Sequence, residues 1–80
     1  MTGEEEVLIQ SPLLYRLMRG ANGALAIEVV VGGIALSTVR VSLNDQETAS
    51  YAREGAAFID RMARAIMADP PFGGRAVDVP

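Results

Sequence analysis

Most of the side chains that carry out catalysis in proteins are missing from this sequence. It contains no Cys and no His, so disulfides, thiolate metal sites and the commonest general base at neutral pH are all excluded. Four Ser are present, but there is no His or Lys to activate them as nucleophiles. Because no glycine-rich loop leads from a predicted strand into a predicted helix, no phosphate-binding loop is expected. We therefore predict a protein that is not an enzyme and that has no cofactor and no metal ion.

Carboxylates are the remaining candidates for chemistry. Most of them lie at the chain start or on a predicted helix surface, which are positions typical of solvated charge. Glu28 is different, because it interrupts an otherwise apolar run of residues. We predict that Glu28 has a structural role, in which its carboxylate pairs with Arg40 on a neighbouring strand.

The elements that would position this pair are two apolar, β-branched runs, Ala24–Val31 and Ile34–Leu43. They are separated by Gly32-Gly33, which supplies the positive φ angles of a two-residue turn, so the runs predict a β-hairpin. One face of the first run is apolar. Its other face is small and apolar apart from Glu28, a pattern typical of a partly covered surface.

Helix signals lie on both sides of the predicted hairpin. Ser11-Pro12, followed by apolar residues at helical spacing, predicts a short helix that Gly20 ends. After the hairpin, Asn44 with Glu47 three residues later predicts a capping box and the start of a long helix.

The predicted long helix covers residues 45–68 and contains Gly55, which is unfavourable inside a helix. Small neighbouring residues favour a continuous helix that approaches another element closely. Two short helices separated at Gly55 are the alternative.

These elements predict one small α+β domain over residues 1–80, with a short N-terminal helix, a β-hairpin and a long C-terminal helix packed on the hairpin. We expect residues 1–6 and 72–80 to be mobile tails. Residues 7–10 are compatible with a short extended piece. Residues 76–79 alternate like an edge strand that adds to a sheet of this chain or of a partner.

The net charge is -3, and all seven basic residues are Arg. Sequence-independent nucleic-acid binding requires clustered basic residues, so it is not expected. No apolar run is long enough to span a membrane, and the acidic start Met1–Glu6 is unlike a targeting peptide, so we predict a cytoplasmic protein. The Arg-only, Ala- and Gly-rich composition is typical of bacterial or phage coding sequences.

Surplus apolar surface predicts an interaction role. The long helix has small and apolar residues at steps of three and four, and together with the two-sided first strand they exceed what a hairpin and one helix can bury. We predict a homodimer that binds another protein, as an accessory subunit, an antitoxin-like protein or a phage-encoded inhibitor of a host system. The predicted interface residues are Ala52, Gly55, Ala56, Ile59, Ala63 and Ile66.

A second hypothesis comes from the second strand. The run Thr38-Val39-Arg40-Val41-Ser42-Leu43, followed by a helix, is similar to the opening of ribbon-helix-helix repressors, in which strands of two subunits pair and enter the major groove. This resemblance implies a DNA-binding transcriptional regulator that reads DNA with Thr38, Arg40 and Ser42. The predicted hairpin would occupy a strand edge that pairs in that family, so DNA binding is the alternative hypothesis.

Overall fold

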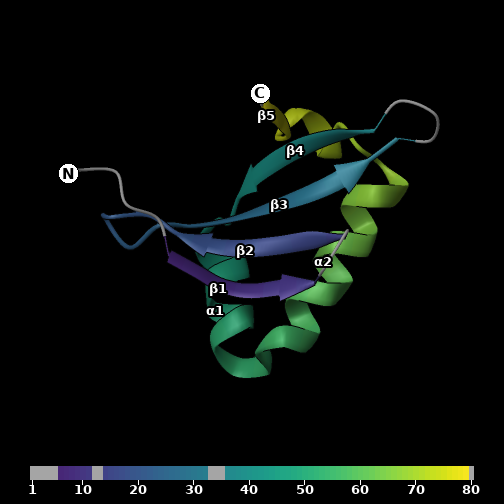
Figure 1. Ribbon diagram of the computed structural model, residues 1–80. Helices are drawn as coiled ribbons and strands as arrows, with labels where there is room; N and C mark the ends of the chain where they lie inside the picture. The colour runs from purple at the N-terminus through teal and green to yellow at the C-terminus, as the bar shows by residue number, and fades with distance from the viewer. Residues whose placement is uncertain (1–5, 12–13, 33–35, 80) are drawn as a thin grey trace.

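The computed structural model describes residues 6–11, 14–32 and 36–79 (Figure 1). Five strands form one antiparallel sheet in the order β1-β2-β3-β4-β5, and two α-helices lie together on one side of it (Figure 1). In chain order the elements are β1 (Glu6–Ser11), β2 (Tyr15–Arg19), β3 (Leu25–Val31), β4 (Ser37–Ser42), α1 (Asp45–Glu54), α2 (Ala56–Ala68), the 3₁₀ turn η1 (Phe72–Gly74) and β5 (Val77–Val79).

The predicted arrangement of an N-terminal helix, a hairpin and one long C-terminal helix is wrong. Residues 15–19, expected in the helix, form β2, which pairs with β1 on one edge and with β3 on the other. Leu17 and Met18 are both buried, as expected for adjacent residues on opposite faces of a central strand. A short apolar run fits the period of a helix and that of a strand. Here the hydrogen bonds to two neighbouring strands outweigh the few hydrogen bonds of a two-turn helix. Pro12 and Leu13 lie outside the described residues.

The predicted pairing of the two apolar runs is confirmed, because β3 and β4 are antiparallel neighbours. The predicted two-residue turn is wrong. Val31 pairs with Ser37, so the strands are joined through residues 32–36, and Gly33 itself lies outside the described part of the chain. The expected extended piece at residues 7–10 is also confirmed as part of β1. The last strand, β5, adds to the chain's own sheet beside β4.

The long helix is divided at Gly55, so the continuous helix is wrong and the alternative of two helices is confirmed. Gly55 has φ 69° and ψ -144°, a conformation that a residue without a Cβ adopts at little cost. This change of direction lets α2 lie against the sheet, where Ile59, Ala63 and Ile66 are fully buried. The predicted capping box is confirmed, since Asn44 Oδ1 accepts from Glu47 N at 2.8 Å and Glu47 Oε1 accepts from Asn44 N at 2.9 Å.

The core lies between α2 and one face of the sheet. Leu17, Ile27 and Val41 come from three adjacent strands, and all are fully buried in the same apolar cluster as the α2 residues. In the described part of the chain, no helix lies on the opposite side (Figure 1). We call it the helix-free face; by strand register its residues are Val7, Gln10, Arg16, Met18, Ala26, Glu28, Val30, Thr38, Arg40, Ser42, Val77 and Val79.

Candidate protein-binding face

A row of side chains crosses all five strands at the centre of the helix-free face, and Glu28 is its middle member. In this row Gln10 pairs with Arg16, Arg16 with Glu28, Glu28 with Arg40, and Arg40 with Val77. Cross-strand partners lie side by side on the same face. The row therefore collects three ionisable groups that are far apart in the sequence.

Glu28 is paired with both arginines of this row. Arg16 donates from Nε to Glu28 Oε1 at 2.9 Å, and its Nη2 is 2.8 Å from the same oxygen. Arg40 Nη1 lies 3.7 Å from Glu28 Oε2, so the predicted pair with Arg40 is confirmed. Arg16 is the nearer partner, and the sequence did not predict it, because Arg16 lies beside Glu28 only when residues 15–19 form a strand. The alternation of Arg16 and Met18 with Tyr15 and Leu17 is the signal compatible with a strand.

The three charged groups differ strongly in their access to solvent. The Glu28 side chain is 6% exposed, whereas the side chains of Arg16 and Arg40 are 44% and 33% exposed. The carboxylate is hidden and the two guanidinium groups reach the surface. The centre of the helix-free face therefore presents Arg side chains to solvent, although the whole chain has a net charge of -3.

Exposed apolar side chains lie on both edge strands of this face and beside its hollow. Val7 lies opposite Met18 and Val77 lies opposite Arg40, and both valines are exposed. Leu14 is also exposed and lines a hollow on this face together with Glu28 and other residues. Exposed apolar residues that gather on one face beside polar groups are typical of interaction surfaces.

The hollow beside Arg16 has a volume of about 230 Å³. This is below the roughly 300–1,000 Å³ of typical small-molecule sites, so it is better matched to a side chain of another protein than to a cofactor. Its lining combines apolar, hydroxyl, amide and charged groups from β1, β2, β3 and β4. The lining residues are Gln10, Ser11, Leu14, Tyr15, Arg16, Glu28, Val30 and Thr38.

The structure does not bring the six predicted interface residues together on one exposed surface. Ile59, Ala63 and Ile66 are fully buried against the sheet of the same chain. Ala52 and Ala56 are exposed on either side of Gly55, near the junction of α1 and α2. Sequence periodicity identified the apolar stripe of α2, but it could not show that the additional strands would cover that stripe.

The alternative DNA-reading residues share one face, as their alternation predicted. Thr38, Arg40 and Ser42 all lie on the helix-free face of β4. However, β4 is flanked by β3 and β5 of the same chain. Pairing with a second subunit through β4, as in the ribbon-helix-helix arrangement, would require β5 to leave its place.

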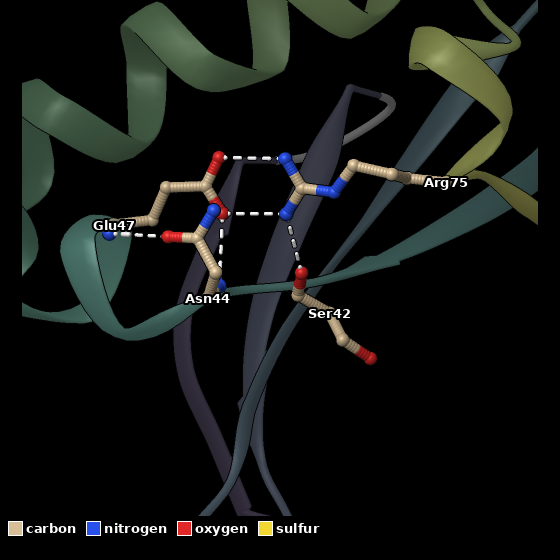
Figure 2. A network of polar contacts seen from close by, with 4 residues as sticks. All are labelled: Ser42, Asn44, Glu47 and Arg75. Carbon is tan, nitrogen blue, oxygen red and sulfur yellow. Dashed lines mark hydrogen bonds and ion pairs between the residues drawn. The ribbon is translucent and has the colours of Figure 1, made fainter.

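The C-terminal strand is held beside β4 by Arg75 (Figure 2). Arg75 donates from Nη1 to Glu47 Oε2 at 2.9 Å, from Nη2 to Glu47 Oε1 at 2.6 Å, and from Nη2 to the carbonyl oxygen of Ser42 at 2.8 Å. These bonds lower the pKa of Glu47, whereas partial burial acts in the opposite direction. We call Arg75, Glu47, Asn44 and Ser42 the Arg75 clasp; it joins the β5 segment to the start of α1.

A second polar contact joins the helix layer to β2. Tyr15 Oη donates to Asp60 Oδ1 at 3.3 Å, and Arg64 Nε donates to Asp60 Oδ2 at 2.8 Å. The Arg64 guanidinium lowers the pKa of Asp60, and burial together with the Asp60 carboxylate raises the pKa of Tyr15. This contact lies on the helix side of the sheet, opposite the Glu28 row.

Within the described residues, no group of three or more His, Cys, Asp or Glu side chains is placed to hold a metal ion. In the same part of the chain, no helix has the length and apolar character needed to cross a membrane. Comparison with protein-family models, with curated proteins and with solved structures finds no match for this chain.

Proposed function

We propose that this protein is a non-enzymatic protein-binding module and that it binds its partner through the helix-free face. The observation that supports the proposal is that exposed apolar side chains, at Leu14 and on both edge strands, share that face with two partly exposed guanidinium groups. Interfaces in which apolar contacts and Arg side chains lie together are common among protein complexes, because Arg combines apolar contact with directed hydrogen bonds.

The edges of the sheet are poorly suited to pairing with a strand of a partner. The strand β1 has an irregularity between Val7 and Ile9, where the pairing register with β2 shifts. At the other edge, β5 is only three residues long. Bulges and short edge strands reduce the pairing of a sheet with other chains. This argument favours side-chain contacts across the helix-free face.

A second copy of this chain has less support as the partner than a protein of different sequence. Of the residues predicted to form a dimer interface, Ile59, Ala63 and Ile66 are already buried within the chain. The geometry therefore supports binding to another protein more strongly than homodimer formation.

DNA binding has less support from the same face. Affinity for nucleic acid requires several basic groups that displace counterions from the phosphates. By strand register, the helix-free face has only Arg16 and Arg40 as basic residues among those described, and both are paired with Glu28. This arrangement lacks the extended positive surface that a phosphate backbone requires.

The proposal is tested by affinity capture with the tagged full chain in an extract of its native source. We compare the wild type with Leu14→Glu and Val77→Glu on the helix-free face, and with Ala57→Glu as a matched control on the exposed side of α2. Replacing either of these exposed apolar side chains by Glu is expected to reduce retention of the partner about tenfold. The control variant is expected to retain it like the wild type.

Circular dichroism and urea unfolding establish that the three variants are folded. Equal retention of the same proteins by all four chains, or a loss confined to Ala57→Glu, contradicts the assignment of the helix-free face. Specific binding of duplex DNA that is lost in Arg40→Ala would instead support the regulator hypothesis.

A further inference from the structure

The guanidinium group of Arg16 is only partly used within the chain. Its contacts with Glu28 involve Nε and Nη2, which form one edge of the planar group. A guanidinium has five N–H donors in a fixed plane, so the donors of Nη1 and the outer donor of Nη2 are directed away from Glu28. No hydrogen bond joins Arg16 Nη1 to another described residue, and the side chain is 44% exposed.

Glu28 makes this donor edge rigid. Its carboxylate is almost completely buried and is fixed from the other side by Arg40. An Arg that is already held by a buried carboxylate loses less conformational entropy when it binds a further group. Glu28 therefore lowers the entropic cost of binding a further acceptor group to Arg16.

The hollow beside Arg16 offers both polar and apolar surface. Leu14 and Val30 contribute aliphatic groups, and Ser11 and Thr38 contribute hydroxyl groups. An acidic side chain has the matching composition, because it has an aliphatic stem and ends in a carboxylate. Carboxylate and guanidinium groups form paired, charge-assisted hydrogen bonds of defined geometry.

We propose that the hollow receives a carboxylate side chain, glutamate or aspartate, of the partner protein, and that Arg16 binds it through its Nη1 and Nη2 donors. This inference rests on the proposed function, because it assigns the chemistry of the partner at the same face. It makes Arg16 the residue that selects an acidic partner segment. Glu28 is a positioning residue that orients Arg16.

The test is a nuclear magnetic resonance titration of the ¹⁵N-labelled full chain with two matched probes, acetyl-Leu-Glu-Leu-amide and acetyl-Leu-Gln-Leu-amide. The peptides differ only in charge and in one acceptor group. We expect the glutamate peptide to shift the amide signals of Leu14, Arg16, Val30 and Thr38. The glutamine peptide is expected to bind about tenfold more weakly, because it forms a neutral hydrogen bond in place of a charge-assisted one.

Variants separate Arg16 from the general charge of the protein. Arg16→Gln is expected to bind the two peptides equally. Arg61→Gln removes the same charge from the exposed surface of α2, without contact to the residues of the hollow, and is expected to keep the preference for the glutamate peptide. The comparison of the two peptides on the wild-type chain remains decisive even where Arg16→Gln fails to fold.

Equal affinity of the wild type for the two peptides overturns this inference, as do shifts that lie outside the hollow. Larger shifts of the same amides on addition of a DNA duplex would overturn it as well. If Leu14→Glu and Val77→Glu lose the captured partner while the wild type does not distinguish the two peptides, only the carboxylate assignment fails. If those variants retain the partner, the proposed function itself fails.

Discussion

The Glu28 carboxylate is buried at the centre of the helix-free face and lies between the guanidinium groups of Arg16 and Arg40. An ionisable residue within an apolar strand must be paired when it is buried, because an unpaired buried charge is very costly. The sequence therefore predicted a cross-strand partner, and the pairing of β3 with β4 made Arg40 the natural choice. It could not predict Arg16, since that residue becomes a neighbour only when β2 is a strand that pairs with β3.

The two arginines are expected to contribute unequally to stability. Double-mutant cycles that combine Glu28→Gln with Arg16→Gln or with Arg40→Gln measure each pair separately. Because the closest approach to Glu28 is 2.8 Å for Arg16 and 3.7 Å for Arg40, we expect a larger coupling for the first pair. Both guanidiniums are partly exposed, so solvent reduces the coupling to about 1 kcal/mol for Arg16 and to less than half of that for Arg40. Urea unfolding provides the free energies, and an Arg40 coupling equal to or above that of Arg16 would contradict the observed geometry.

Helix and strand features that depend on a few consecutive residues could be predicted from the sequence. Features that depend on neighbouring strands could not. The capping box at Asn44 was predicted because all its donors and acceptors lie within four consecutive residues. The spacing of apolar residues in 15–19 fits both a helix and a strand, and only the pairing with β1 and β3 selects the strand. The candidate site shares this limit: its residues come from separate strands, so the sequence identified Glu28 and Arg40 but could not assemble the face.

The division of the helices at Gly55 predicts the sign of one substitution. In a continuous helix, Gly55→Ala would stabilise the protein by roughly 1 kcal/mol. At φ 69° the same substitution places an alanine in a strained conformation, although a Cβ there would meet no other atom. We therefore expect a loss of about 1–2 kcal/mol in the free energy of unfolding. Thermal or urea unfolding of the two chains decides the matter, and a stabilised Gly55→Ala would mean that the helix is continuous.

The Arg75 clasp is expected to stabilise the domain by joining β5 to α1. Replacement by Met in Arg75→Met removes three hydrogen bonds, two of them to a carboxylate, and is expected to lower the free energy of unfolding by about 1–2 kcal/mol. Arg61→Met is a matched control, because Arg61 also pairs with a carboxylate, that of Glu54, and also lies over a Phe ring. The Arg61 pair is more exposed, so its loss is expected to stay within about 0.5 kcal/mol.

The pH dependence of the clasp follows from the lowered pKa of Glu47. A carboxylate whose pKa is lower in the folded state stabilises that state above its unfolded pKa, which is 4.5 for a glutamate. This stabilisation decreases as the pH falls through the folded-state pKa. The difference between wild type and Arg75→Met should therefore be largest near neutral pH and shrink as the pH falls below 4.5. A difference that is constant over this range would show that the Glu47 carboxylate does not carry the effect.

For the whole molecule, the central feature is the asymmetry between the two faces of the sheet. Five strands supply two faces, but the helices cover only one of them (Figure 1). The sequence indicated this asymmetry in residues 24–31, where one side of the strand is apolar and the other carries Glu28. It could not show how wide the face without a helix would be, because that depends on β2 pairing between β1 and β3.

The most direct test of the proposed role of the helix-free face is cross-saturation transfer from an unlabelled bound partner to the deuterated, ¹⁵N-labelled chain. The partner is the protein that the wild type captures and that Leu14→Glu loses. We predict signal loss at residues of the helix-free face, including Arg16, Val30 and Val77, and none at Ala57, Arg61 or Arg64. Transfer concentrated on α1 and α2, with the helix-free face unaffected, would contradict the account.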